Sequence, residues 1–138
     1  MAGYSETPLL KKLGIKEGAR VSLVNAPQDF PPELGTLPEG AKFLSASHKK
    51  LDLILVFVKS RAELSKSLDQ LRPKLSQSGM LWVAWPKKSS GVETDLSFTE
   101  VQEAGLATGI VDTKICAIND VWSGLKFVIR LKDRTVES

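Results

Sequence analysis

Two continuous apolar runs constrain the fold of this chain more than any other feature. Leu51 to Val58 and Met80 to Trp85 are almost entirely apolar, which is typical of strands covered on both faces in a parallel sheet. Between them, Ser60 and Glu63 form a capping-box pattern that predicts the start of a helix. Four leucines then follow at helical spacing: Leu64, Leu68, Leu71 and Leu75. With Gly79 closing the connection, the segment is predicted to be a right-handed βαβ unit.

Shorter elements are predicted on both sides of this unit. Thr7 and Pro8 favour a helix start, because Thr caps free N–H groups and Pro is tolerated at the first helical position. Leu9, Leu10 and Leu13 share one face of that helix, which Gly14 ends. The other predicted elements are a strand over 20–24, a helix from Ser97 to about Ala107, a strand over 110–118 and a last strand over 125–131. In the last strand Leu125, Phe127, Ile129 and Leu131 alternate with mostly polar residues, which indicates an antiparallel partner.

These elements predict one α/β domain over residues 1–138, with frayed ends at 1–6 and 133–138. Its predicted architecture is a mostly parallel, Rossmann-like sheet flanked by helices and closed by a C-terminal antiparallel β-hairpin. A short strand over 41–45 poses a geometric problem, because residues 46–50 span at most about 17 Å. That is too short for a parallel return to the next strand. The segment is therefore expected to be a stub, or to run antiparallel beside Leu51 to Val58.

Composition excludes several classes of protein. The 138 residues carry a net charge of +3 from 19 cationic and 16 acidic residues, and the lysines are spread along the chain. This argues against nucleic acid as a partner, since such proteins concentrate positive charge on one face. No apolar run reaches the length of about 18 residues that a membrane helix needs, so no membrane partner is expected. The single cysteine, Cys116, suits a reducing compartment, and we expect a cytoplasmic protein. One His and one Cys do not make a metal site, although a magnesium site made only of carboxylates stays open.

The order of elements resembles the class I methyltransferase fold. Leu13 to Val21, which reads Leu-Gly-Ile-Lys-Glu-Gly-Ala-Arg-Val, is similar to the entry into the first strand of that fold. The second half resembles its strands four to seven. Two longer stretches resemble a small bacterial family catalogued only as a domain of unknown function: Trp85 to Leu96, and Asp112 to Ala117 followed by Trp122-Ser123-Gly124-Leu125. This second resemblance implies no particular activity.

The chain departs from methyltransferases where those enzymes hold S-adenosylmethionine. Asn25-Ala26-Pro27-Gln28-Asp29 follows the first strand and lacks the glycine-rich turn that lets a cofactor approach the backbone. The possible second strand is followed by Ser45-Ala46-Ser47-His48, without the acidic residue that would hold a ribose. No cofactor is therefore predicted, and tight binding of S-adenosylmethionine is not expected.

Candidate site residues follow from the rule that ligands bind outside the carboxyl ends of parallel strands. The rule selects ten residues, with the final hairpin turning back at the same edge: Asn25, Lys59, Arg61, Lys87, Lys88, Ser90, Gly91, Thr94, Asp95 and Trp122. Lysine charges and free N–H groups at helix N-termini predict a small molecule bearing phosphate or carboxylate. Three alternatives stay open. The Lys87 loop could be solvated surface, Asp95 could only complement a helix dipole, and Trp122 could belong to the core.

Three functions are compatible with this layout. The first is a non-catalytic binding or interaction module with an anion-attracting edge. The second is an enzyme with an atypical nucleotide or S-adenosylmethionine site, and the third is a subunit of a homodimer joined at a sheet edge. The sequence has no Gly-x-Ser-x-Gly elbow, no Walker motif and no Cys-x-x-Cys. Cys116 is interpreted as a core residue, because no basic neighbour in sequence would activate its thiol.

Overall fold

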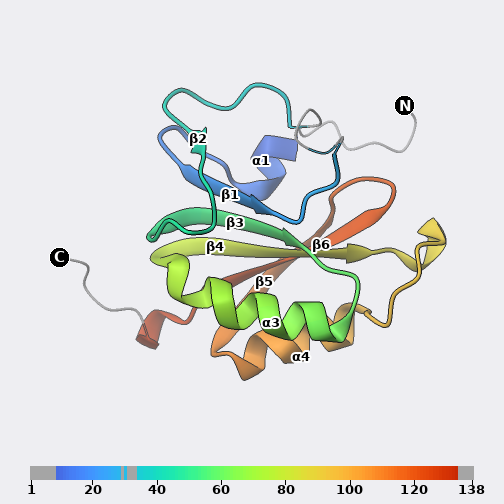
Figure 1. Cartoon of the computed structure of the whole chain (residues 1–138). Helices are drawn as coiled ribbons and strands as arrows, with labels where there is room; N and C mark the ends of the chain where they lie inside the picture. Colours follow the sequence, from blue (N-terminus) through green and yellow to red (C-terminus); the bar gives the residue numbers. More distant parts are fainter. Residues whose placement is uncertain (1–8, 29, 31–33, 134–138) are drawn as a thin grey trace.

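The computed structural model describes residues 9–28, 30 and 34–133, and all of its strands join one mixed sheet (Figure 1). The helices are α1 (Leu9–Leu13), α3 (Arg61–Leu71) and α4 (Phe98–Ala107). The strands are β1 (Arg20–Val24), β2 (Lys42–Phe43), β3 (Leu51–Phe57), β4 (Leu75–Pro86), β5 (Ile110–Ala117) and β6 (Trp122–Ile129). Three short 3₁₀ turns complete the description: η1 (Arg72–Lys74), η2 (Lys88–Ser90) and η3 (Leu131–Asp133). The predicted cap at Thr7 and Pro8 lies outside the described residues.

The sheet has the order β2-β1-β3-β4-β6-β5. Strands β2, β1, β3 and β4 run parallel, whereas β6 pairs antiparallel with both β4 and β5. The predicted Rossmann-like sheet with a closing antiparallel hairpin is therefore confirmed. No helix in the described part of the chain is long and apolar enough to cross a membrane.

Each face of the sheet carries its own apolar core. Helices α3 and α4 lie on one face, where Leu64, Leu68 and Val101 pack against β3, β4 and β6. Helix α1 lies on the opposite face, where Leu13 packs in the second core. The indole Nε1 of Trp82 in β4 donates a hydrogen bond of 2.9 Å to the Leu13 carbonyl. This buried bond satisfies a free carbonyl at the end of α1 and holds the helix on the sheet.

Three predicted boundaries were wrong. Residues 75–79 were expected to finish a helical crossover, but they are the first part of β4. Helix α3 ends earlier because η1 contains Pro73, and Gly79 lies within the strand. A Cβ on Gly79 would lie 2.9 Å from the Leu51 carbonyl oxygen, so the close strand approach requires glycine. Strand β6 begins at Trp122, three residues before its predicted start, and ends at Ile129. Leu131, predicted to face inward, is 78% exposed in η3.

The short second strand is a stub, which was one of the two predicted alternatives. Strand β2 has two residues and runs parallel to β1, pairing Lys42 with Arg20 and Phe43 with Val21. The antiparallel alternative beside β3 is therefore wrong. Because β2 is so short, the chain needs only residues 44–50 to return to the start of β3.

Candidate functional site

The loops predicted to share one edge of the sheet do meet there. Pro86 at the end of β4 pairs with Trp122 at the start of β6, and the Lys87 N–H donates to the Val121 carbonyl at 2.8 Å. The Thr94 hydroxyl donates to the Lys59 carbonyl at 2.6 Å. The loops after β3 and β4 and the turn before β6 therefore lie together at the carboxyl edge, as predicted.

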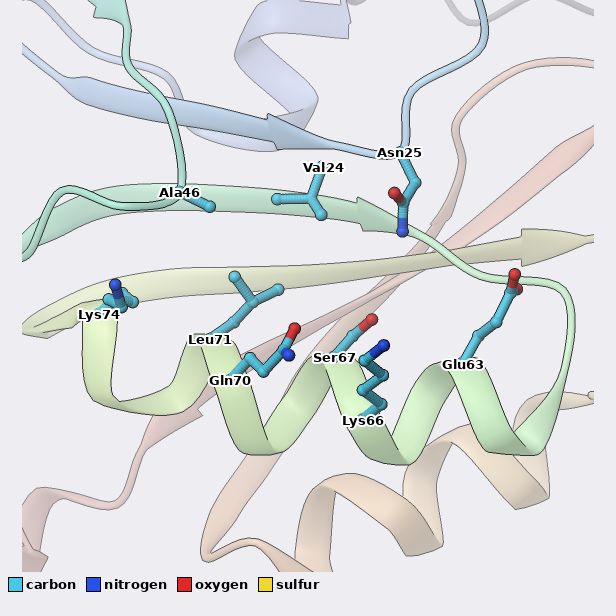
Figure 2. A pocket seen from close by; sticks show the side chains of 9 residues that line it. All are labelled: Val24, Asn25, Ala46, Glu63, Lys66, Ser67, Gln70, Leu71 and Lys74. Carbon is cyan, nitrogen blue, oxygen red and sulfur yellow. The ribbon is translucent and has the colours of Figure 1, made fainter.

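Asparagine forms the turn after β1. The φ angle of Asn25 is 60°, in the left-handed region that asparagine tolerates better than most residues other than glycine. The turn after β1 therefore adopts a left-handed conformation without glycine. The exposed Asn25 side chain points from the end of β1 toward α3 (Figure 2).

The N-terminus of α3 is bonded to the protein's own side chains. The Ser60 hydroxyl accepts from the Glu63 N–H at 3.1 Å, and a Glu63 carboxylate oxygen accepts from the Lys59 N–H at 2.7 Å. Asp95 accepts from the Arg61 N–H at 2.9 Å. This contact is the one expected of a carboxylate that complements the helix dipole. Of the predicted site residues, Arg61, Thr94 and Asp95 thus tie the two loops together.

A negative charge also lies at the N-terminus of α4. The Ser97 hydroxyl hydrogen-bonds the Glu100 carboxylate, and the Arg61 guanidinium lies 3.6 Å from that carboxylate. The hydrogen bond from Ser97 lowers the pKa of Glu100, with a smaller contribution from Arg61. Ser97, where the helix was predicted to begin, is the N-cap of α4, and its hydroxyl bonds the Glu100 side chain and not a backbone N–H.

The Lys87 to Gly91 loop is shaped by its own hydrogen bonds. The Ser90 hydroxyl donates to the Lys87 carbonyl at 2.6 Å and accepts from the Val92 N–H at 3.1 Å. Gly91 has a φ of 79°, so it supplies the left-handed turn after η2. Lys87 is half-buried and Lys88 is exposed. These loop residues line neither of the two cavities described next.

The first cavity, here called the edge cavity, lies at the ends of β1 and β3 and has a volume of 640 Å³. It brings together three of the predicted site residues, Asn25, Lys59 and Trp122. Its full lining is Asn25, Ala26, Pro27, Phe57, Lys59, Glu63, Val121 and Trp122. Trp122 is only 7% exposed and packs edge-on against Phe57 with ring centroids 5.0 Å apart. Trp122 therefore serves mainly the core and forms a wall of the cavity with its remaining surface.

The second cavity, here called the α3 groove, has a volume of 550 Å³ and runs between α3 and the β1–β2 side of the sheet (Figure 2). Its lining is Val24, Asn25, Ala46, Glu63, Lys66, Ser67, Gln70, Leu71 and Lys74. Asn25 and Glu63 line both cavities, so the two adjoin at the end of β1. Sequence reasoning missed Lys66, Ser67, Gln70 and Lys74. The only signal was that Lys66, Gln70 and Lys74 recur every four residues, which places them on one helix face.

The chemistry of the two linings favours binding. Lys59, Lys66 and Lys74 contribute three positive charges, and Glu63 contributes the one negative charge. Neither lining contains a histidine or a cysteine. Within the described residues no group of three or more His, Cys, Asp or Glu could hold a metal ion. Cys116 is half-buried on β5, where burial raises the pKa of its thiol, so it is a poor nucleophile.

Solved structures similar to this chain include methyltransferases. An S-adenosylmethionine-dependent methyltransferase from Aquifex aeolicus is 18% identical, with a TM-score of 0.63 and coverage of 88% of each chain. A fibrillarin pre-rRNA processing protein from Methanococcus jannaschii is 12% identical, with a TM-score of 0.64 and coverage of 92% of this chain and 70% of the other. A precorrin-6y C5,15-methyltransferase from Geobacter metallireducens is 8% identical, with a TM-score of 0.65 and coverage of 88% and 86%. At these identities the likeness establishes a methyltransferase-like fold alone.

Family membership comes from a separate comparison. No curated protein matches the chain significantly. The model of the family described as "Protein of unknown function (DUF3052)" matches residues 37–131, from the segment before β2 to the start of η3 after the last strand. Since this match spans more than half of the sequence, the chain belongs to that family.

Proposed function

We propose that this protein is a ligand-binding module that takes a small anionic organic molecule in the edge cavity and the adjoining α3 groove. The observation that carries the proposal is the continuity of the two cavities at Asn25 and Glu63. Together they extend from the ends of β1 and β3 along α3, and ligands of open α/β sheets bind outside the carboxyl ends of strands. Each volume falls in the range of about 300–1,000 Å³ that is typical of ligand sites.

Charge supports an anionic ligand. Lys59 lies on the edge cavity, and Lys66 and Lys74 lie on the α3 groove. Lys87 and Lys88 are at the same edge, where the Lys87 N–H bonds Val121 of the edge-cavity wall. The single lining carboxylate, Glu63, already accepts a hydrogen bond from the Lys59 N–H. Lysines around a concave surface raise the local concentration of an anion and speed its association.

A binding role fits the lining better than a catalytic role. Neither cavity presents a histidine or a cysteine that could act as base or nucleophile. A small-molecule role also fits the cytoplasmic location that the lone cysteine predicts. The homodimer stays a prediction that a mass measurement in solution would test.

An enzyme with an atypical S-adenosylmethionine site is the second candidate function. Two observations favour it: the methyltransferase-like fold, and the tight left-handed turn at Asn25 where methyltransferases carry glycine. A similar structure, fibrillarin from Aeropyrum pernix, contains natively bound S-adenosylmethionine and has a TM-score of 0.56 at 13% identity. Against this candidate, exposed Ser45 and Ser47 follow β2 where a ribose-binding acid would be needed.

Titration of ¹⁵N-labelled protein with S-adenosylmethionine, adenosine, AMP and ATP tests both candidates. The module predicts saturable shifts of the Asn25 and Lys59 amide signals with AMP or ATP, weakened by Lys59→Ala. Lys114→Ala is the matched control, because Lys114 is an exposed lysine on β5 away from both cavities. Tight binding of S-adenosylmethionine alone would favour the enzyme. No response of Asn25 and Lys59 to any of the four compounds would contradict both.

A further inference from the structure

Ser67 is a polar residue of α3 that lines the α3 groove. The residue lies in the middle of α3 and is only 8% exposed, and its hydroxyl makes no hydrogen bond to another group in the described part of the chain. A buried serine in a helix normally bonds the carbonyl four residues earlier. The Ser67 hydroxyl instead lines the α3 groove, and Figure 2 shows it directed away from the helix axis toward the strands. The hydroxyl oxygen is not sealed from the solvent in the groove, so it can exchange a water molecule for an atom of a bound molecule.

Positively charged and amide side chains flank Ser67. Lys66 and Gln70 come from neighbouring positions of α3, and Lys74 comes from η1 one turn later. Lys74 Nζ donates to the Ser47 carbonyl at 3.3 Å, which holds this lysine at the end of the groove. Lys66 and Gln70 are exposed side chains on the same rim. The polar groups of the groove are thus the Ser67 hydroxyl, the amides of Asn25 and Gln70, the ammonium groups of Lys66 and Lys74, and the Glu63 carboxylate at the end where the groove meets the edge cavity.

Three apolar side chains also line the groove. Val24 of β1 and Ala46 after β2 face Leu71 of α3, and all three pack against the core of this sheet face. An inorganic ion would leave these side chains uncovered. A larger molecule can place its organic body against Val24 and Leu71 while its charged group contacts the polar wall.

We propose that the α3 groove binds the phosphoryl group of a phosphate monoester, with the Ser67 hydroxyl donating to a phosphate oxygen and Lys66 and Lys74 supplying charge. This inference rests on the proposed function, because it assigns the charged end of the ligand expected there. Phosphate fits better than carboxylate. The lining contains no arginine, the residue that pairs planar carboxylates through two parallel bonds, whereas lysines act as point charges for phosphate.

Inorganic phosphate is the direct probe of this subsite. In a ¹⁵N NMR titration against sodium chloride of equal ionic strength, phosphate should produce saturable shifts of the Ser67 and Gln70 amides. Ser67→Ala should weaken phosphate binding about tenfold, because a hydrogen bond to a charged group is lost. Lys66→Ala together with Lys74→Ala should weaken it several-fold, and Lys114→Ala should leave it unchanged. Because the two lysines lie on the rim of the groove, this pair of changes tests the proposal even if Ser67→Ala fails to fold.

Several outcomes would overturn the inference. They are shifts that grow linearly without saturation, an unchanged affinity in the lysine double variant, or phosphate responses confined to the Lys87 loop. The failure of the proposed function would look different. If adenosine and AMP bound equally at Asn25 and Lys59, the ligand site would stand and the phosphoryl subsite would be wrong. If phosphate bound at Ser67 while no organic compound affected Asn25 or Lys59, the ligand-binding function would be wrong.

Discussion

Replacing Ser67 with alanine should stabilise the unliganded protein by about 1 kcal/mol. Two effects contribute. Alanine is the better helix former by about 0.5 kcal/mol, and removing a hydroxyl that lacks a partner relieves part of a desolvation cost of about 1–3 kcal/mol. Only part of that cost is recovered, because Ser67 lines a cavity that water can enter. For a chain of this size, about 1 kcal/mol corresponds to a rise in Tm of about 3–5 °C.

Urea denaturation followed by circular dichroism measures this change, and Ser65→Ala is the matched control. Ser65 lies on the same helix but is exposed, so its replacement reports helix propensity alone. The gain in the free energy of unfolding should therefore be about 0.5 kcal/mol larger for Ser67→Ala than for Ser65→Ala. A loss of stability in Ser67→Ala would show that the hydroxyl already has a partner in the folded protein. The reasoning behind the phosphoryl subsite would then be wrong.

Phosphate should remove the difference in stability between the wild type and Ser67→Ala. At a concentration of ten times the wild-type Kd, binding stabilises the wild type by about 1.4 kcal/mol. A variant with tenfold weaker affinity gains only about 0.4 kcal/mol at the same concentration. The advantage of Ser67→Ala should therefore vanish in phosphate and persist in chloride. An equal gain in both proteins would mean that phosphate acts elsewhere or as a general salt.

Three other predictions concern the fold and its carboxyl edge. Gly105→Ala should lower the free energy of unfolding, measured by urea denaturation, by about 1–3 kcal/mol, because a Cβ there would lie 2.1 Å from Phe127 Cε1. Gly91→Ala is the comparison, since a Cβ at Gly91 would meet no atom within 4 Å. It should cost only the strain of a positive φ, about 1–2 kcal/mol. Asp95→Ala should cost about 1 kcal/mol by the same measurement, since it removes the acceptor of the Arg61 N–H; no change would show that this bond contributes nothing. The lowered pKa of Glu100 means that its ionised form stabilises the fold above the unfolded pKa and that this contribution disappears as pH falls through the folded pKa. Glu100→Gln should therefore lower the Tm at neutral pH but not at about pH 2.5, and a constant difference across that range would contradict the assignment.

The βαβ half of the fold could be predicted because its signals are local. Two apolar runs and the Ser60 cap reflect burial and backbone bonding within short windows, and the structure confirms both. The start of β4 could not be predicted in this way. Leu75 continues the helical leucine spacing, but Pro73 ends the helix and the strand pairing with Leu51 decides the rest. Long-range pairing therefore overrode a local periodicity.

The candidate site was predicted only in part, for a related reason. Asn25 and Lys59 were found because strand ends can be located from sequence, and they do line the edge cavity. Ser67 and Lys66 look like the polar face of an ordinary amphipathic helix. They line a groove only because no other segment covers that face of α3. Whether a segment covers it depends on how the whole chain is connected, which local sequence does not show. From sequence, Asp95 could either contact a ligand or only complement a helix dipole. Its hydrogen bond to the Arg61 N–H shows that it contacts the N-terminus of α3.

The α3 groove follows from the short return between β2 and β3. In a parallel sheet the connecting segments normally cover both faces, and a crossover that contains a helix needs about a dozen residues or more. Here residues 44–50 connect β2 to β3, so this connection is too short to lay a helix over β1. Val24 and Ala46 consequently stay partly exposed opposite Leu71. The same segment carries Ser45 and Ser47 where a methyltransferase would need an acidic residue for a ribose. The shortened connection therefore accounts for the open flank of α3, and it makes that flank the place to look for a ligand.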